Sequence, residues 1–221
     1  MFKAVFFDLD ETLIEALYSH SEANKRVFKK FNIDYEEMKN RTKSIDFLGM
    51  RIIDILKKRR DIMGVNEKQL PIRKLAAERE KIFLNLVKKK ATLLPGAKEA
   101  LTYVKSKNKV LGVSSSGIRK YITIVLKKFD LLKFVDFIVG GENVTKGKPN
   151  SECYLKSYSL ASKIIPLEKK ECLVVEDSPN GVIAAKKAGL RVCYVPFFKR
   201  NLQTEVDYQI KNLNEFINIP L

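Results

Sequence analysis

The sequence lacks the features of a membrane-spanning or disulfide-bonded protein. No apolar run reaches the roughly 18 residues that a membrane-spanning helix needs. The opening segment, residues 1–8, becomes acidic too soon for a secretion signal and is typical of a β-strand. Cys153, Cys172 and Cys193 lie far apart and form no CxxC pair, which argues against a disulfide framework or a zinc site. We therefore expect a cytoplasmic protein without membrane association.

Acidic residues are scarce as well. The chain has 26 Asp and Glu against 42 Lys and Arg, so its formal net charge is +16. Such an excess can indicate a nucleic-acid partner. The basic residues, however, come in short scattered clusters such as 57–60 and 88–90, which are typical of solvated helix surfaces. We expect no nucleic-acid partner, and the charge can instead concentrate an anionic substrate.

Short apolar runs alternate with helical patterns along most of the chain. The runs are 3–7, 109–113, 135–139, 172–175 and 191–195. Helical patterns cover about 118–128, 151–162 and 180–188, and Gly189 is a good terminator for the last one. Alternating strands and helices predict an α/β fold with a Rossmann-like, mostly parallel sheet.

Residues 15–92 break this alternation. They contain no convincing strand, and Ile52, Ile53, Leu56 and Met63 form a helical apolar stripe. The sequence thus predicts an α/β core of residues 1–14 and 93–221, with residues 15–92 inserted as a helical cap domain. Ligands of open α/β sheets bind beyond the carboxyl ends of the strands, so an insertion after the first strand covers that site.

Two carboxylates follow the first predicted strand, in Asp8-Leu9-Asp10. One carboxylate can act as a nucleophile while the other transfers a proton. The pair can also bind magnesium through oxygen, or serve only in a turn. The motif alone does not decide between these uses.

Three further polar motifs follow later strands. Ser114 to Gly117 can bind an anion or simply begin a helix, since serine is a preferred N-cap. Lys148, before a proline, offers a positive charge for phosphate. Glu176 and Asp177 end an apolar strand, where they can bind a metal or interact with the dipole of the following helix.

Taken together, the order of these motifs resembles the haloacid dehalogenase-like hydrolase superfamily over the whole chain. The matching motifs are Asp8-Leu9-Asp10-Glu11-Thr12, Ser115, Lys148 and Glu176-Asp177. The helical insertion, Leu94-Pro95-Gly96, and the run from Glu176 to Gly181 are similar to the subgroup that holds phosphoglycolate phosphatase, sugar phosphatases and β-phosphoglucomutase.

The resemblance implies a role for each acidic residue. Asp8 would be the nucleophile and would form a phosphoaspartyl intermediate, while Asp10 would act as general acid and then as general base. Magnesium would be bound by the Asp8 carboxylate, the Asp10 carbonyl and Asp177, with Glu176 beside it or behind it.

The same resemblance assigns the phosphate-binding residues. Ser115, Ser116 and Lys148 would bind the phosphoryl oxygens, and Lys148 would also offset the charge of Asp8. A carboxylate does not readily approach a dianionic phosphate without cations, so magnesium and a lysine meet a real electrostatic need.

Asp10 and its neighbours distinguish branches of the superfamily. An acid at Asp10 argues against dehalogenases, which protonate no leaving alcohol, and against phosphonate-cleaving enzymes. Thr12 is typical of phosphatases, whereas the mutase often has valine there. Glu11 and Glu15 depart from the usual glycine and aspartate.

The predicted cap offers two candidate substrate-binding residues, His20 and Arg51. His20 is the only histidine and matches one in the mutase and several sugar phosphatases, while Arg51 follows a loop glycine, Gly49. Both can equally be surface residues. The mutase has lysine where Leu48 stands.

The sequence therefore predicts a magnesium-dependent phosphatase for a small phosphorylated metabolite, such as a sugar phosphate or a phosphoglycolate-like ester. A phosphomutase of the β-phosphoglucomutase type is one alternative, and a basic nucleic-acid-binding or protein-binding module on the same fold is another. We expect a monomer or a weak dimer.

Overall fold

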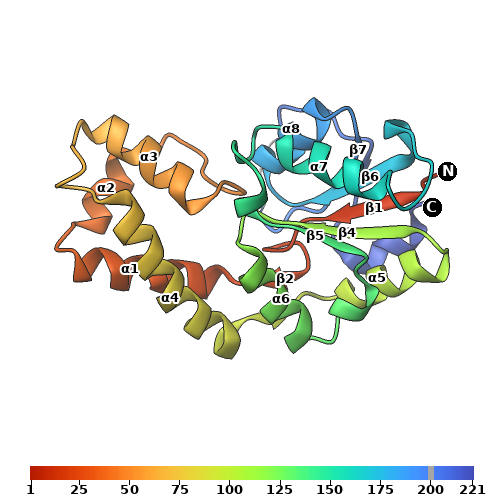
Figure 1. Cartoon of the computed structure of the whole chain (residues 1–221), viewed down its shortest axis with the longest axis horizontal. Coiled ribbons are helices and arrows are strands. Elements are labelled where there is room, and N and C mark those ends of the chain that lie inside the picture. Colours follow the sequence, from red (N-terminus) through yellow and green to blue (C-terminus); the bar gives the residue numbers. More distant parts are fainter. Residues whose placement is uncertain (199–201) are drawn as a thin grey trace.

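The computed structural model of the chain describes residues 1–198 and 202–221. Two lobes are visible in Figure 1: a sheet with helices on both faces, and a group of helices at one end. Both termini lie at the end of the sheet lobe that is remote from this group of helices (Figure 1). The helical lobe therefore lies at the end of the sheet lobe that is opposite to the termini.

The sheet has six strands in the order β5-β4-β1-β6-β7-β8, and all neighbouring strands are parallel. The strands are β1 (Ala4–Phe7), β4 (Val110–Ser114), β5 (Phe137–Val139), β6 (Cys172–Glu176), β7 (Arg191–Tyr194) and β8 (Tyr208–Gln209). The predicted α/β fold with a mostly parallel sheet is confirmed, with all five predicted strands. β8 was not predicted, because two residues are too few to show an alternating pattern.

Helices cover both faces of the sheet. One face carries α5 (Ala97–Ser106) and α6 (Arg119–Lys128), and the other carries α7 (Glu152–Ala161) and α8 (Pro179–Lys187). Short 3₁₀ turns complete this lobe: η1 (Leu132–Phe134), η2 (Gly141–Asn143), η3 (Lys169–Glu171) and η4 (Leu213–Asn218).

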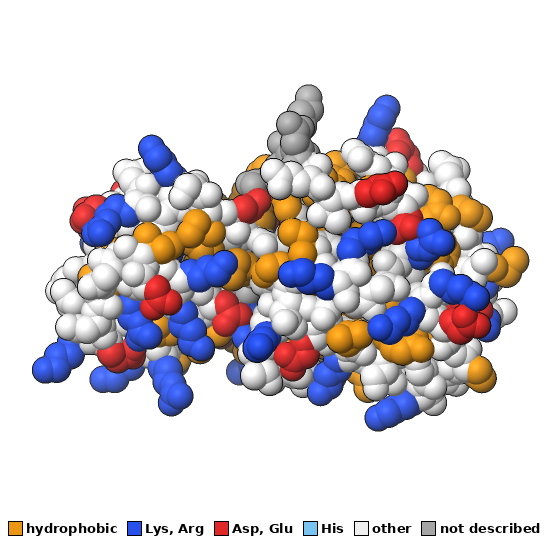
Figure 2. Space-filling model, turned by 90° about the horizontal axis from the view of Figure 1, so that it is seen from above, with side chains coloured by type: hydrophobic (Ala, Val, Ile, Leu, Met, Phe, Trp, Pro, Cys, Tyr) orange, Lys and Arg blue, Asp and Glu red, His pale blue; other side chains and the backbone are white. Residues whose placement is uncertain are grey.

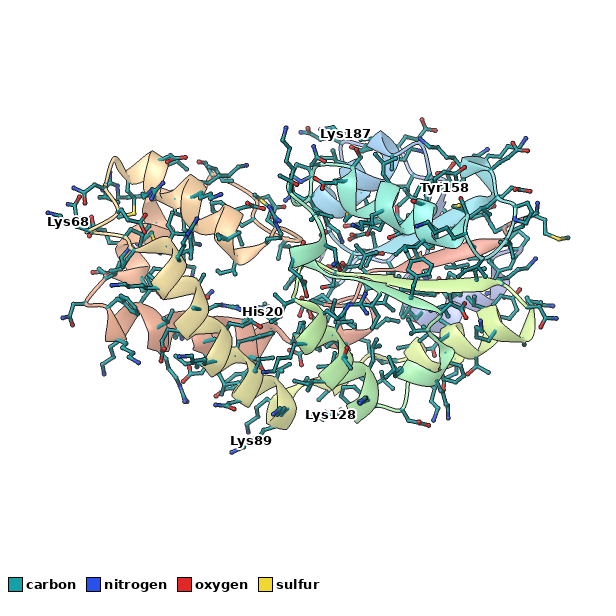
Figure 3. The ribbon with its side chains drawn as sticks, in the orientation of Figure 1. His20, Lys68, Lys89, Lys128, Tyr158 and Lys187 are labelled. Carbon is teal, nitrogen blue, oxygen red and sulfur yellow. The ribbon has the colours of Figure 1, made fainter. Side chains whose placement is uncertain are left out.

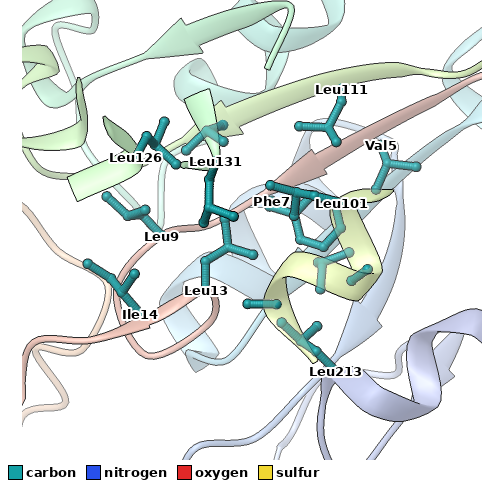
Figure 4. Close-up of a cluster of buried hydrophobic side chains, with 14 of the residues drawn as sticks. Val5, Phe7, Leu9, Leu13, Ile14, Leu101, Leu111, Leu126, Leu131 and Leu213 are labelled. Atoms are coloured by element: carbon teal, nitrogen blue, oxygen red, sulfur yellow. The ribbon is translucent and has the colours of Figure 1, made fainter. Parts of the chain in front are cut away.

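Alternation along β1 explains the two layers. Val5 and Phe7 pack with α5 and α6 (Figure 4), whereas Ala4 and Phe6 pack with α7 and α8. A strand buried on both faces is apolar at every position, which is why the first strand reads as a continuous apolar run. Cys153, Cys172 and Cys193 are buried free thiols in this lobe.

The helical lobe consists of α1 (Leu17–Lys30), α2 (Tyr35–Arg41), α3 (Ile52–Met63) and α4 (Ile72–Lys90). It has its own apolar core, formed by Val27, Phe28, Met38, Leu56, Leu70, Ile72 and Leu75. Gly64, with φ of 64°, ends α3 in the left-handed conformation that glycine favours. Among the described residues, no helix is both long and apolar enough to cross a membrane.

The chain passes between the lobes through a small antiparallel pair. β2 (Ile14–Glu15) leaves the sheet lobe and β3 (Thr92–Leu93) returns to it, with Ile14 opposite Leu93. This pairing places the two passages side by side. Both strands are too short to be recognised in the sequence.

Candidate active site

The polar motifs meet at the carboxyl ends of three neighbouring strands. β1 pairs with β4 on one side and with β6 on the other, so the residues that follow these strands lie together. Asp8 follows β1, Ser115 follows β4, and Glu176 with Asp177 closes β6. Parallel pairing thus brings together side chains that are far apart in sequence.

Lys148 lies between two of the carboxylates. Its Nζ is 2.5 Å from Asp8 Oδ1 and 2.5 Å from Glu176 Oε1, and only 1% of its side chain is exposed. Although burial favours the neutral amine, the neighbouring Asp8 and Glu176 carboxylates raise the pKa of Lys148 well above its usual value. Lys148 is therefore a buried ammonium beside Asp8.

Both oxygens of Glu176 have protein donors. The Tyr154 hydroxyl donates to Oε1 at 2.5 Å, and the Ser178 hydroxyl donates to Oε2 at 3.0 Å. A Cβ at Gly181 would lie 1.9 Å from Glu176 Oε1, so only glycine fits beside this carboxylate. Glu176 is held behind the site, where it positions Lys148.

The acidic cluster has the composition of a metal site. Asp8, Glu176 and Asp177 are buried, and one oxygen from each lies within 4.8 Å of the others. Burial raises the pKa of Asp8 to about 8 against the lowering effect of Lys148, and burial also raises that of Asp177. When all three carboxyl groups are ionised, one ammonium does not balance their charge, and a hard divalent cation bound through oxygen would offset the excess.

Asp10 connects the two lobes. The Tyr121 hydroxyl donates to Asp10 Oδ1, and His20 Nε2 lies 3.3 Å from Oδ2. Arg79 Nη2 lies 2.6 Å from His20 Nδ1. Because arginine only donates, Nδ1 of His20 accepts and its Nε2–H points to Asp10. This tautomer is a neutral form of the imidazole, and burial favours the neutral form because it lowers the pKa of His20.

The two predicted phosphate-binding serines have different surroundings. Both line a pocket between the two lobes, and Ser115 Oγ accepts a hydrogen bond from Gly117 N–H at 3.0 Å. The Ser116 hydroxyl instead donates to the Gly49 carbonyl of the helical lobe at 2.6 Å. In this arrangement the Ser116 side chain joins the lobes, whereas Ser115 directly follows β4, the neighbour of the strand that Asp8 follows.

Arg51 is not among the residues that line the pocket between the lobes, so its contact with substrate stays a prediction. Its Nη1 donates to the carbonyls of Gly141 and Val144 at 3.0 and 2.7 Å, and its Nη2 donates to that of Thr145 at 2.8 Å. Its Nε pairs with Asp54 at 2.7 Å. The guanidinium is thus fully used in joining α3 to the loop after β5.

A pocket of about 600 Å³ lies between the lobes. Asp8, Asp10, Ser115 and Asp177 line its sheet side, and helical-lobe residues line the other. His20 lies at the junction of the lobes in Figure 3, whereas Lys68 and Lys89 lie on the outside of the helical lobe. A volume of this size is typical of small-molecule sites.

Two buried arginines line the helical side of this pocket, and the sequence did not reveal them. Arg59 and Arg79 are 8% and 4% exposed, and neither forms an ion pair with a carboxylate among the described residues. Arg59 was expected on a solvated surface as part of cluster 57–60. It is buried because it occupies a turn of the Ile52–Leu56–Met63 stripe of α3, at helical spacing.

Arg79 likewise fills a gap in the apolar stripe of α4 that Leu75, Ile82 and Leu86 define. A cation inside an apolar stripe is the signal that could have identified both arginines. For Tyr121, which lies on the buried face of α6, the sequence holds no such signal.

Carboxylates at parallel strand ends, a buried lysine between two of them and a helical lobe over the pocket define a class of α/β hydrolases. The chain belongs to one family of this class, the haloacid dehalogenase-like hydrolases, whose family model matches residues 5–195. It is a hydrolase of the phosphatase type.

Named relatives agree with this assignment. The chain is similar to a phosphorylated carbohydrates phosphatase of Thermotoga maritima, with 30% identity over 87% of this chain and 84% of the relative. Hexitol phosphatase B of Escherichia coli is 29% identical over 87% of this chain and 83% of the relative. Among solved structures, CbbY of Rhodobacter sphaeroides in complex with phosphate has the same fold, with a TM-score of 0.80, 21% identity, and coverage of 99% of this chain and 100% of that chain.

Proposed function

We propose that this protein is a magnesium-dependent phosphatase that hydrolyses a small phosphorylated carbohydrate through an aspartyl phosphate at Asp8. The observation that carries the proposal is the contact of buried Lys148 with Asp8 at the carboxyl end of β1, within the acidic cluster of Asp8, Glu176 and Asp177. Relatives named for phosphorylated carbohydrates and hexitols support the substrate class.

The proposed reaction begins at Asp8. A carboxylate oxygen of Asp8 attacks phosphorus, the ester P–O bond breaks, and Asp10 gives a proton to the leaving alcohol. Water then attacks the phosphorus and loses a proton to Asp10, so that inorganic phosphate leaves and Asp8 is regenerated. Hydrogen bonds from Tyr121 and His20 orient the Asp10 carboxylate for both transfers.

Bound magnesium would supply positive charge that lets the Asp8 carboxylate approach a dianionic phosphate. The Asp8 carboxylate, the Asp10 carbonyl and Asp177 would hold it, with Glu176 behind. Thr12 donates to Asp177 Oδ1 at 3.2 Å and orients that carboxylate. Ser115 and Lys148 would bind the phosphoryl oxygens.

Residues 15–92 act in this proposal as a cap domain that encloses the substrate, while residues 1–14 and 93–221 form the catalytic core. Closure excludes water from the pocket and brings His20 to Asp10. Figure 2 displays Lys and Arg side chains spread over both lobes rather than gathered into one patch on this face, which agrees with a surface role for most of the charge.

The test is hydrolysis of a panel of phosphorylated sugars, polyols and phosphoglycolate, with p-nitrophenyl phosphate as a general substrate. We expect phosphate release that requires Mg²⁺ and stops in excess EDTA. Formation of glucose 6-phosphate from β-glucose 1-phosphate is measured in parallel, because phosphate transfer without net hydrolysis would favour the mutase alternative. Absence of any phosphate release would contradict the proposal.

A further inference from the structure

Arg59 of α3 is a buried cation that has no carboxylate counter-ion among the described residues. It is 8% exposed, and its Nε is fully buried without a hydrogen-bond partner in the part of the chain that the structure describes. Burying an unpaired charge is strongly unfavourable, and proteins normally provide a carboxylate beside it. No described carboxylate forms an ion pair with Arg59.

Two aromatic rings fix the Arg59 guanidinium instead. Its carbon lies 5.0 Å from the centre of the Phe47 ring and 5.5 Å from that of Tyr35. Such contacts orient a planar cation and attract it weakly, but they do not neutralise its charge. The stacking therefore holds the group in place without satisfying its hydrogen-bond donors.

The side chain borders the substrate pocket. Arg59 and Lys43 line the helical side, and the terminal amino groups of Arg59 form no hydrogen bond with any residue that the structure describes. The acidic residues that line the pocket, apart from Asp46 and Glu80, lie at the sheet side with Asp8. Asp46 Oδ1 accepts a hydrogen bond from the Leu48 N–H at 3.0 Å.

We propose that Arg59 binds a second anionic group of the substrate, a carboxylate or a phosphate, at the end remote from the phosphoryl group that is hydrolysed. This inference rests on the proposed function and narrows its substrate class to phosphate esters with two anionic ends. Arginine binds either group through paired hydrogen bonds, and a low-dielectric pocket strengthens the attraction. Lys43 adds positive charge at the same side.

Matched pairs of phosphate esters test the proposal. 6-Phosphogluconate and glucose 6-phosphate differ by a carboxylate, and fructose 1,6-bisphosphate and fructose 6-phosphate differ by a second phosphate. For at least one pair, we expect the wild-type kcat/KM to be at least tenfold higher for the doubly anionic member. Arg59→Gln should reduce that ratio by about tenfold or more, and the pair that responds identifies the anion.

Arg60→Gln is the matched control, because Arg60 is the next residue of α3 and pairs on the surface with Glu67. It should leave the ratio unchanged. Arg59→Lys keeps the charge without the planar fork and should retain part of the ratio, which covers the case in which Arg59→Gln fails to fold. An equal wild-type kcat/KM for both members of both pairs, or a ratio unaffected by Arg59→Gln, overturns the inference.

Binding separates this inference from the proposed function. Titration calorimetry of the Asp8→Asn protein with the same four esters reports affinity without turnover. Tighter binding of a doubly anionic ester that is lost in Asp8→Asn/Arg59→Gln supports the Arg59 site even if no ester is hydrolysed. Hydrolysis of p-nitrophenyl phosphate without any such preference, in contrast, leaves the phosphatase standing and removes the Arg59 site.

Discussion

The two lobes differ in whether their buried charges form ion pairs. In the sheet lobe, Lys148 touches both Asp8 and Glu176, and Thr12 touches Asp177. In the helical lobe, Arg59 and Arg79 are buried with no carboxylate partner among the described residues. The difference teaches that the sheet side of the pocket is organised by its own ion pairs and hydrogen bonds, whereas on the helical side we propose that a substrate anion completes the arrangement.

Removing the nucleophile should give the largest effect. Asp8→Asn keeps the size of the side chain but replaces the carboxylate with a poor nucleophile, so turnover should fall on the order of 10⁴-fold or more. Steady-state hydrolysis with circular dichroism as a folding check measures this. Asp61→Asn, at an exposed position of α3, is the matched control. Wild-type activity in folded Asp8→Asn would exclude Asp8 as the nucleophile.

The metal site should separate two adjacent acids. Asp177→Ala should weaken Mg²⁺ binding by more than the roughly 10–100-fold typical of residues that only orient metal ligands. Glu176→Ala should weaken it less, because both Glu176 oxygens already accept hydrogen bonds from protein groups. Activity is measured against free Mg²⁺, with Mn²⁺ binding as an independent readout. A larger loss of metal affinity in Glu176→Ala would reverse our assignment of the two acids.

His20 should matter most when the leaving group needs a proton. His20→Ala removes the Nε2–H that orients Asp10, and kcat/KM for a sugar phosphate should fall by roughly tenfold, about 1.4 kcal/mol. p-Nitrophenyl phosphate should lose less, because its phenolate leaves without protonation. Equal losses for both substrates would show that His20 acts on cap closure or general integrity.

Arg51 should give the smallest and least selective effect. Arg51→Ala removes its hydrogen bonds to the loop after β5, so kcat/KM should fall several-fold and to the same extent for a sugar phosphate and p-nitrophenyl phosphate. Arg60→Ala, on the same helix, serves as the control. A loss confined to the sugar phosphate would support Arg51 as a substrate-binding residue.

Residues at strand ends could be predicted because their position follows from local sequence. Asp8, Ser115 and Asp177 each end or follow an apolar run, and parallel pairing necessarily gathers such residues at one edge. The α/β fold followed from the same alternation. Lys148 was recognised by its motif rather than by its strand, since it follows β5 by several residues.

The helical lobe was harder to predict because its contacts depend on how the lobes meet. Arg51 follows a glycine and was expected at the substrate, yet it binds carbonyls that no sequence pattern reveals. Glu11, where glycine is usual in the family, has a φ of 59°, a left-handed conformation that explains that preference. A local departure was visible in the sequence, but its backbone cause was not.

The contact between the lobes is covalent on one side only. There the chain crosses through β2 and β3, while elsewhere Ser116, Asn180 and Arg51 bind across it through hydrogen bonds. Each of these contributes about 0.5–1.5 kcal/mol and can break and re-form. The easiest opening is therefore a rotation about an axis through the β2–β3 pair, which releases the hydrogen-bonded edge and leaves the sheet register intact. The rate at which substrate and product exchange would then depend on the breaking of those hydrogen bonds rather than on movement of the catalytic strands.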